Sequence, residues 1–541
     1  MDRPEPVNAR HAWRRLGLIV AAGAALFLWR LGSHDLWPPD EPRFALVAKE
    51  MWQRGDYSVL SLNDHLYTDK PPLFFWAING FGRILGGIDE WAARLHSAVS
   101  TILAMLLIER LGAWLYDRKT GLVAALVFAT SPQILERGRW ASIDMTLNVF
   151  VLSAIALFWV VRKRPEGARA RATAAWAMMA LATLAKGPVG LLLPIIAVLP
   201  LALIERDFGA VRRTFALPGP IVYLAITLSW FGLFAWRLGP GFALQVLMHQ
   251  NVDRYVEAWN ATHPVWYYLW RFPVGFFPWI VFLPWAIAHA LSDEERDRRS
   301  AALFFLSWIA AIFLFFSFST GKRGVYIIPL YPAAAILVAR LLTRAGDPEA
   351  AAVARRLRAP LYVWAGAALL LAVGLPLAAR HRDPALAPIA AAIGIALAAG
   401  PCAAIVLHAR RRTGHAWIGL VGSLVLVMLL ATEGLFPWID RHENISGFAS
   451  QVKVRLDPGA AFATTEEKRD AWVFYTGRFA EEADTPEAIR EFLARPGKRQ
   501  LLIEDDLRRA VDLATLPDVV ESLRGRVAGQ GYSLLTKGDR P

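Results

Sequence analysis

The hydrophobic pattern of the chain consists of long apolar runs separated by short breaks rich in arginine. Runs of about 20 apolar residues are long enough to cross a hydrocarbon core of about 30 Å. A polar residue and two helix breakers, Lys186-Gly187-Pro188, divide one of the longest runs. The pattern predicts a polytopic membrane protein with about thirteen spanning helices, at residues 13–31, 94–114, 120–135, 145–161, 173–186, 189–204, 217–236, 272–291, 301–319, 325–342, 360–379, 385–407 and 416–437.

Basic residues set the expected orientation of these helices. With the N-terminus inside, the arginine clusters all fall on the inner side, as the positive-inside rule requires; they lie near residues 118–119, 162–171, 206–213, 296–299, 344–358 and 410–412. Arg380 and Arg382 depart weakly from the rule. The outer loops, at 32–93, 136–144, 237–271, 320–324 and 380–384, hold more of the acidic, histidine and aromatic residues. We expect the first apolar run to be retained as a span, because no clear small-residue cleavage site follows it.

The first outer loop is expected to be structured. Residues 41–54 read as an amphipathic helix, with apolar side chains on one side and charges on the other. Pro71-Pro72 then precedes an apolar stretch at 73–85, and proline is well tolerated in the first turn of a helix. About 13 residues are too few to span, so this second helix should lie along the membrane interface.

The composition changes after the last apolar run. Residues 438–541 are charged and mixed. They contain strand-like runs at 460–463, 472–475 and 500–503 and helix-like stretches at 486–494 and 507–513. The sequence therefore predicts two domains, a transmembrane domain over 1–437 and a small soluble α/β domain over 438–541.

The overall composition excludes several classes of protein. The chain is 55% hydrophobic, and only 19% of its residues are charged. The net charge of +13 is explained by the inner arginine clusters rather than by nucleic-acid binding. One cysteine, Cys402, permits neither an intramolecular disulfide nor a multi-cysteine metal site. The absence of a Gly-Lys-Ser or Gly-Lys-Thr ending argues against an ATP-driven pump.

Charged residues in the outer loops are the candidates for chemistry. Asp40 and Glu41, with Arg43 beside them, could bind, orient or deprotonate an acceptor, or could simply start a helix at the interface. Asp69 and Lys70 could provide a carboxylate for a divalent metal and a cation for a phosphate, or could form a solvated turn.

Further candidates lie at the ends of later spans. Asp144 stands at the mouth of the fourth span, where an ionisable residue is either functional or a helix cap. His249, Arg254 and His263 lie in one outer loop, and histidine with a carboxylate could form an open zinc site. Lys322, Arg323 and Tyr326 occupy an outer turn, where two basic residues indicate an anionic partner unless they merely snorkel to the interface.

Two motifs carry a resemblance to a known family. Asp40-Glu41-Pro42-Arg43, followed by Tyr67-x-x-Lys70-Pro71-Pro72, resembles the membrane glycosyltransferases of the GT-C fold. Within that fold the chain looks like the ArnT type, the lipid A aminoarabinose transferases, which are related to the protein O-mannosyltransferases. The expected topology, a long first outer loop and an outward C-terminal domain, is similar to that group.

The resemblance implies a function and a set of roles. It implies transfer of a sugar, such as 4-amino-4-deoxy-L-arabinose, with inversion, from undecaprenyl phosphate to lipid A or another envelope acceptor. A monomer in the bacterial inner membrane would carry this out, with a cytoplasmic N-terminus and a periplasmic active site. The implied catalytic residues are Asp40, Asp144 and Glu41; the implied phosphate-binding residues are Lys70, Arg254, Arg43, Tyr326 and Lys322; Asp69 and His249 would hold a divalent metal, zinc. The family commonly has glutamate where this chain has Asp69, so the carboxylate here has a shorter reach.

Other functions remain open at this point. An enzyme similar to the protein O-mannosyltransferases would act on proteins instead. A lipid or solute transporter would place ionisable groups near the bilayer midplane on broken helices, and only Lys186-Gly187-Pro188 resembles such a break. A non-catalytic scaffold would tolerate alanine at Asp40. The sequence does not identify the sugar or the role of the C-terminal domain.

Overall fold

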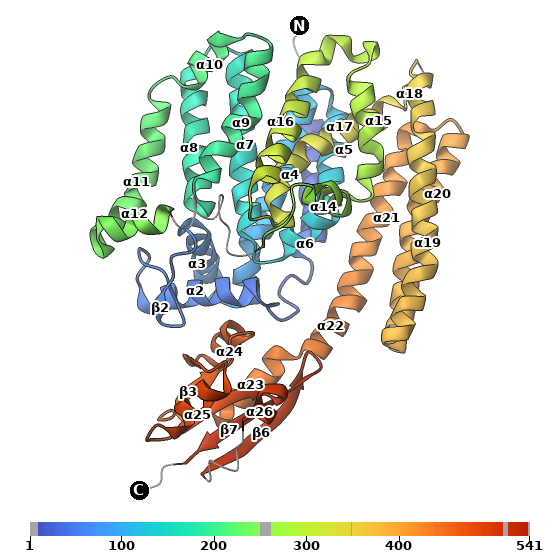
Figure 1. Cartoon of the computed structure of the whole chain (residues 1–541). Helices are drawn as coiled ribbons and strands as arrows, with labels where there is room; N and C mark the ends of the chain where they lie inside the picture. Colours follow the sequence, from blue (N-terminus) through green and yellow to red (C-terminus); the bar gives the residue numbers. More distant parts are fainter. Residues whose placement is uncertain (1–8, 249–260, 348, 512–517, 539–541) are drawn as a thin grey trace. The chain divides into compact units, whose positions relative to one another are not determined.

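The structure, a computed structural model, describes residues 9–248, 261–347, 349–511 and 518–538 (Figure 1). It divides into two compact units that are not contiguous in sequence. Unit 1 comprises Met1–Trp29, Asp69–Phe74 and Leu95–Ala431, and unit 2 comprises Arg30–Thr68, Phe75–Arg94 and Thr432–Pro541. The predicted domain boundary lies at residue 437, and in the structure most of the first outer loop packs with the C-terminal segment.

Unit 1 is a bundle of helices built around buried apolar side chains. Its helices are α1 (Ala9–Gly23), η1 (Ala24–Leu28), most of α4 (Glu90–Leu115), α5 (Arg118–Ala129), α6 (Pro132–Arg139), α7 (Ile143–Lys163), α8 (Ala168–Lys186), α9 (Val189–Ile204), α10 (Phe208–Thr214), α11 (Gly219–Leu238), α12 (Pro240–Met248), α14 (Tyr267–Phe276), η3 (Trp279–Phe282), α15 (Leu283–Ala290), η4 (Asp293–Arg298), α16 (Arg299–Phe318), η5 (Gly324–Leu330), α17 (Tyr331–Arg344), α18 (Ala351–Arg356), α19 (Arg358–Arg382), η6 (Pro384–Leu386), α20 (Ala387–Ala409), η7 (Thr413–His415) and α21 (Ala416–Leu430).

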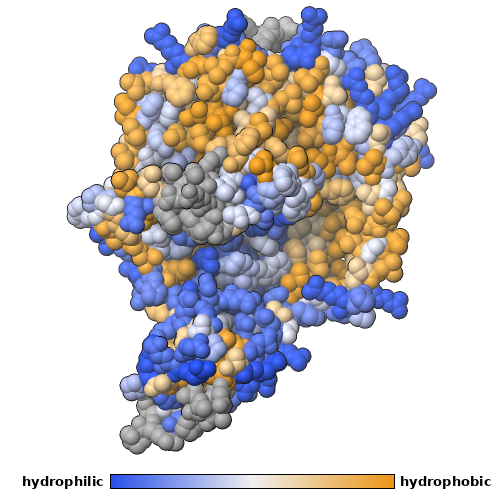
Figure 2. All heavy atoms as spheres, viewed as in Figure 1, coloured by the Kyte–Doolittle hydropathy of each residue, from blue (hydrophilic) through white to orange (hydrophobic). Residues whose placement is uncertain are grey.

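The exposed and buried surfaces of these helices fit a lipid environment. The stretch Gly324–Arg344, which contains α17, is the most buried of the long apolar stretches, so it forms the centre of the bundle. By contrast, α11 exposes large apolar side chains such as Leu228 and Trp236, and α19 exposes Leu370 and Val373. Figure 2 shows the broad apolar surface that results. An apolar exterior around a packed interior is what a bundle in lipid requires.

Eight helical stretches within the described residues are long and apolar enough to cross a membrane, and a bent pair, Tyr267–Phe276 with Trp279–Ala290, would make a ninth. They are Glu90–Leu115, Ile143–Lys163, Phe208–Leu238, Asp293–Phe318, Gly324–Arg344, Ala351–Arg382, Pro384–Ala409 and Thr413–Arg455. The predicted multi-pass helical fold is therefore confirmed. The predicted spans at 13–31, 120–135, 173–186 and 189–204 are largely helical but shorter or more charged, so a count of thirteen stays a prediction. The break at 186–188 is observed, because α8 ends at Lys186 and α9 begins at Val189.

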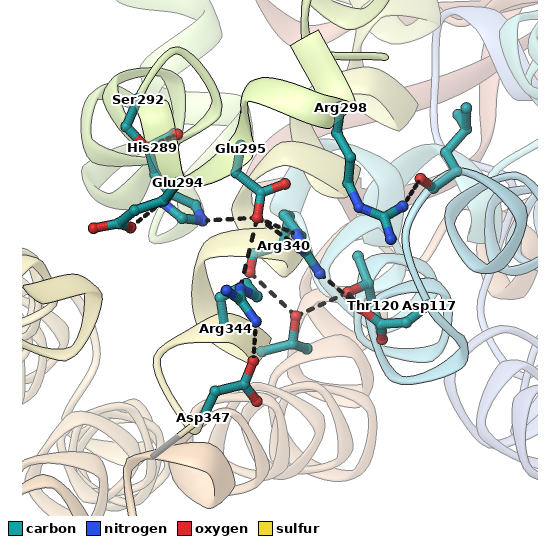
Figure 3. A network of polar contacts seen from close by, with 12 residues as sticks. Asp117, Thr120, His289, Ser292, Glu294, Glu295, Arg298, Arg340, Arg344 and Asp347 are labelled. Atoms are coloured by element: carbon teal, nitrogen blue, oxygen red, sulfur yellow. Dashed lines mark hydrogen bonds and ion pairs between the residues drawn. The ribbon is translucent and has the colours of Figure 1, made fainter. Parts of the chain in front are cut away.

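A polar network ties together the helix ends on the side of unit 1 where the arginines gather (Figure 3). Arg340 on α17 donates to Glu295 Oε1 from Nε at 3.1 Å and from Nη2 at 2.6 Å. It also donates from Nη1 to Asp117 Oδ2 at 2.8 Å, and Asp117 caps α5 by accepting from the backbone N–H of Thr120. Side chains of α5, η4 and α17 thus fix one another at this end of the bundle.

Unit 2 combines the first outer loop with a small sheet domain. The loop contains α2 (Asp40–Arg54), a two-stranded ribbon of β1 (Ser61–Leu62) and β2 (His65–Leu66), and most of α3 (Leu73–Leu85). The remaining elements are η8 (Ala431–Leu435), α22 (Phe436–Glu443), α23 (Ile445–Arg455), β3 (Ala461–Thr464), α24 (Arg469–Thr476), β4 (Glu481–Glu482), α25 (Pro486–Ala494), β5 (Arg499–Glu504), α26 (Asp505–Ala510), β6 (Val519–Val527) and β7 (Gln530–Lys537).

The strands form one five-stranded sheet in the order β4-β3-β5-β7-β6. β3 pairs with β4 and β5 in parallel, and β7 pairs with β5 and β6 antiparallel. Its core includes Ile489 and Phe492 of α25 against Leu501 and Leu535 of the sheet. The predicted small α/β domain is therefore confirmed.

Most predicted elements of unit 2 are observed, with one clear error. The predicted helices at 41–54, 73–85 and 486–494 and the strands at 460–463 and 500–503 match α2, α3, α25, β3 and β5 within a residue or two. The strand predicted at 472–475 is wrong, because these residues belong to helix α24, which Gly477 ends in the left-handed conformation at φ 73°. Trp472, Val473 and Phe474 are buried there, so tertiary packing overrides the β propensity of the run. The predicted helix at 507–513 is shorter, at Asp505–Ala510, and part of it lies outside the described residues.

Candidate active site

A buried ion pair fixes the start of α2. Arg94 on α4 donates to Glu41 from Nε and from Nη2, each at 2.8 Å, and neither side chain is more than 1% exposed. The same guanidinium donates to the carbonyls of Leu31, His34 and Asp35 at 3.1, 2.8 and 2.6 Å. Glu41 also accepts from the backbone N–H of Trp37 at 3.0 Å. Glu41, a predicted catalytic residue, thus serves to hold the segment before α2 in place, and its catalytic role stays a prediction.

Asp40 and Arg43 lie on the first turn of α2, next to this ion pair. Asp40 is the first residue of the helix and is half-buried, at the end where the helix dipole favours a carboxylate. Arg43, three positions later, donates from Nε to Asp470 Oδ2 at 3.0 Å. Because residues three apart on a helix are neighbours, Asp40 and Arg43 form one charged patch.

In unit 1, Lys186 contacts two of the predicted site residues, Asp144 and Tyr326. Lys186, the last residue of α8, forms a short ion pair with Asp144 in the first turn of α7. The same ammonium lies 4.6 Å from the centroid of the Tyr326 ring, in η5. Asp144 and Lys186 are 14% and 16% exposed, so the pair is largely shielded from solvent. Ser142, and not Asp144, occupies the N-cap position of α7, so the reading of Asp144 as a helix cap is wrong.

The remaining predicted residues of unit 1 have separate surroundings. Asp69 and Lys70 are half-buried at the turn before α3, where Lys70 donates to the carbonyl of Asp69 at 2.9 Å. Lys322 is buried and donates to the carbonyls of His263, at 2.8 Å, and Ser319. Burial lowers the pKa of Lys322. These contacts give Lys322 a structural role in its turn, and a role in phosphate binding stays a prediction.

Two of the predicted site residues cannot be placed. His249 and Arg254 lie outside the described residues, as does the rest of 249–260. Of the two predicted metal ligands, Asp69 is described in the structure and His249 is not. The carboxylate of Asp69 is a suitable oxygen donor for a divalent cation.

Another carboxylate cluster lies in unit 2. Among the described residues, Glu466, Glu482 and Asp484 bring one oxygen each within 4.8 Å of one another. Glu482 pairs with Arg469, and Asp484 accepts from the backbone N–H of Glu466 at 2.6 Å. Burial and the neighbouring Glu482 raise the pKa of Asp484. An arginine and a backbone N–H thus already contact two of the three carboxylates of this cluster.

Comparison with known proteins identifies the family. The sequence profile described as "Dolichyl-phosphate-mannose-protein mannosyltransferase" matches residues 69–236, which include Lys70, Asp144 and Lys186. The fold superposes on the crystal structure of ArnT from Cupriavidus metallidurans, bound to undecaprenyl phosphate, with a TM-score of 0.79 and 25% identity, over 96% of this chain and 97% of that one. The chain resembles the ArnT-like GT-C glycosyltransferases over nearly its whole length. The resemblance drawn from the two loop motifs is thereby confirmed.

Curated relatives of this ArnT-like chain carry one name, "Undecaprenyl phosphate-alpha-4-amino-4-deoxy-L-arabinose arabinosyl transferase". The relative from Erwinia tasmaniensis is 31% identical over 338 residues, which is 60% of this chain and 59% of the relative. The relative from Pectobacterium atrosepticum is 32% identical over 335 residues, which is 60% of this chain and 58% of the relative. The chain thus matches less than two thirds of the length of these curated relatives.

Two residues of the site were not singled out by sequence reasoning. Lys186 enters the sequence prediction only as part of a helix break, although a lysine between two apolar runs is costly enough to indicate a partner. Arg94 was counted as the first residue of a span, where an arginine is expected to snorkel. Its partner Glu41 lies 53 positions away, and no local spacing links them.

Replacing Lys186 in this ArnT-like chain by methionine is expected to lower sugar transfer by at least about tenfold, because Asp144 loses a charged partner worth about 1.5–3 kcal/mol. The thermal stability of the purified protein should also fall. The matched control is Lys163→Met at the other end of α7, where the exposed Lys163 donates to Ser300 at 3.2 Å and lies 5.0 Å from the centroid of the Trp159 ring. Equal activity of the two variants would contradict a role for Lys186.

Proposed function

We propose that the chain transfers a sugar, with inversion, from an undecaprenyl-phosphate donor to lipid A or another envelope acceptor. The observation that carries the proposal is the likeness over nearly the whole chain to an ArnT structure that binds undecaprenyl phosphate. The names of the curated relatives make 4-amino-4-deoxy-L-arabinose the first sugar to test. A monomer would act in the bacterial inner membrane, with the N-terminus in the cytoplasm and the active site in the periplasm.

In the proposed reaction, the lipid phosphate leaves from one side of the sugar and the acceptor attacks from the other side. Negative charge grows on the lipid phosphate as the bond to the sugar breaks, and Lys70 and Arg254 would stabilise that charge, with Tyr326 in support. Asp40 would orient or deprotonate the incoming acceptor on the other side of the sugar, and Arg43 would hold an anionic group of that acceptor. Asp144, with Lys186 as its counter-ion, would be a further acidic residue available to the acceptor. Glu41 would act by positioning Asp40.

Asp69 and His249 remain the proposed ligands of a divalent metal, zinc. An oxygen and a nitrogen ligand leave coordination positions open, and the ion would supply additional positive charge for a leaving phosphate. The reach of Asp69 is shorter than that of glutamate, so we expect weaker metal binding than a glutamate would give.

Mass spectrometry of lipid A tests the proposal. The full-length chain is expressed in a bacterium that makes undecaprenyl-phosphate aminoarabinose but lacks its own transferase. We expect a lipid A species heavier by one aminoarabinose unit, absent from cells with the empty vector. Unmodified lipid A, with the chain present in the membrane, would contradict lipid A as acceptor. Glycosylated envelope proteins in the same cells would then support the acceptor class suggested by the mannosyltransferase profile.

A further inference from the structure

Helix α24 of the C-terminal segment makes a series of polar contacts with the first outer loop inside unit 2. Lys49 of α2 donates to the carbonyl of Phe474 at 2.7 Å, and its ammonium lies 4.6 Å from the centre of that ring. The N–H of Leu36 donates to the hydroxyl of Tyr475 at 2.8 Å. The contacts reach both the segment before α2 and the body of α2, so α24 holds the loop that carries Asp40.

A second contact lies just beyond α24. The side-chain amide of Asn63 donates to the carbonyl of Ala480 at 2.6 Å and accepts from its N–H at 3.0 Å. Both partners are buried. This two-way bond ties the turn between β1 and β2 to the chain that follows α24.

Helix α24 is itself anchored in the sheet domain. Trp472 is fully buried, and its ring centroid lies 5.3 Å from that of Tyr532 on β7 and 6.0 Å from that of Phe448 on α23. Lys468, just before the helix, donates to the hydroxyl of Tyr532 at 3.3 Å. A side chain on α24 is therefore held at a fixed place by the C-terminal domain.

Asp470 is the residue of α24 that meets the charged patch of α2. Its Oδ2 accepts from Arg43 Nε at 3.0 Å, and its side chain is only 12% exposed. Its Oδ1 is buried and has no hydrogen bond within the described part of the chain. Burial lowers the pKa of Arg43, but the hydrogen bond and the charge of Asp470 outweigh it, so that the pKa is raised overall. Arg43 therefore remains charged at any physiological pH.

In the contact with Asp470, only Nε of the Arg43 guanidinium donates a hydrogen bond. Neither Nη group forms a hydrogen bond with any residue that the structure describes, and the side chain is 37% exposed. The two Nη groups form a planar fork that matches the spacing of phosphate oxygens. Asp40 lies three residues before Arg43 on α2, so the two side chains are neighbours, and the charge of Asp40 helps to raise the pKa of Arg43. An anion bound by this fork would lie next to Asp40.

We propose that Asp470 of the C-terminal domain is a positioning residue, which holds Arg43 by Nε so that the Nη groups bind a phosphate of the acceptor beside Asp40. This inference rests on the proposed function and extends it, because it gives the C-terminal domain a part in acceptor recognition. An arginine with a fixed orientation loses less conformational entropy on binding than a free one, so the benefit should appear in acceptor affinity.

Transfer kinetics in proteoliposomes test the inference with the full-length chain and diphosphoryl lipid A. For Asp470→Asn we expect the KM for lipid A to rise about tenfold, the effect of one charged contact, with kcat and the KM for the donor changed less than about twofold. In an Arg43→Ala background the same substitution should have no further effect. The matched control is Asp457→Asn, which breaks an exposed ion pair with Lys498, 2.9 Å long, in the same domain; its KM should equal that of the wild type.

Three results would overturn the inference: an unchanged KM in Asp470→Asn, an equal rise in the KM of the donor, or effects of Arg43→Ala and Asp470→Asn that simply multiply. A lowered thermal stability in Asp470→Asn together with a lower kcat would indicate a purely structural residue. If the wild-type chain transfers no sugar, the proposed function fails, and binding of diphosphoryl lipid A to the purified chain in nanodiscs then provides the readout. Weaker binding in both Asp470→Asn and Arg43→Ala would still support the inference, and unchanged binding would refute it.

Discussion

Asp40→Asn is expected to lower sugar transfer by about 10²–10⁴-fold, the usual contribution of a general base or of a group that orients the nucleophile. Asparagine keeps the size of the side chain but can neither accept a proton nor attract a cation. The protein should fold normally, because Asp40 is only half-buried and the segment before it is held by Glu41 and Arg94. Initial rates of transfer in proteoliposomes, with donor and acceptor saturating, provide the measurement.

The control for this variant is Asp64→Asn in the same loop. Asp64 is exposed and pairs with Arg54 at the surface, so its loss should change the rate less than about twofold. The two variants together separate a catalytic carboxylate from a general effect of charge in the loop. Transfer by Asp40→Asn at the wild-type rate would remove Asp40 from the mechanism and would favour Asp144 as the acidic residue.

Arg94→Met is expected to destabilise unit 2 by about 3–5 kcal/mol, because it leaves the buried Glu41 carboxylate without its counter-charge. The carbonyls of Leu31, His34 and Asp35 also lose their donor. The loss should appear as faster protease cleavage within residues 30–68 and as a lower apparent unfolding temperature of the purified protein. Transfer activity should be lost with it, because the segment before α2 positions Asp40.

A second substitution distinguishes charge from packing. In the double variant Arg94→Met/Glu41→Gln, neither charge of this buried pair remains, so part of the stability should return. Arg83→Met is the matched control, because Arg83 is exposed and donates only to the hydroxyl of Tyr57 at 3.2 Å, a contact whose loss should cost about 0.5 kcal/mol. Protease resistance of Arg94→Met equal to that of Arg83→Met would show that the ion pair does not hold the segment.

The parts of the fold that sequence predicts well are those with strong local signals. The helices at 73–85 and 486–494 are predicted to the residue, because Pro72 directly precedes the first, Pro486 begins the second, and an apolar periodicity runs through each. Strands β6 and β7 were missed. Most residues of β6 are exposed, and the alternation of apolar and polar residues is weak. The two strands are stabilised by pairing within the sheet, β7 with β5 and β6 with β7.

For the candidate site, too, sequence indicates the individual residues but not the distant residues that they contact. The acidic and basic residues of the outer loops could be selected from sequence, because charge is rare in such an apolar chain. Their partners could not, since Arg94, Lys186 and Asp470 are brought to Glu41, Asp144 and Arg43 by packing alone. The sequence even predicts a strand at 472–475, and this wrong prediction conceals the helix that carries Asp470 toward α2.

The non-contiguous composition of unit 2 has a consequence for how the protein is made. Arg43 and Asp470 are 427 positions apart, and Asp470 lies near the end of the chain. A ribosome that adds about 5–20 residues per second needs roughly 20–85 s to reach Asp470 after it has incorporated Arg43. During that interval the outer loop has been synthesised but has no α24 to hold it. The packing of this loop is therefore completed last, and a nascent chain that stops before α24 lacks the helix that holds the loop.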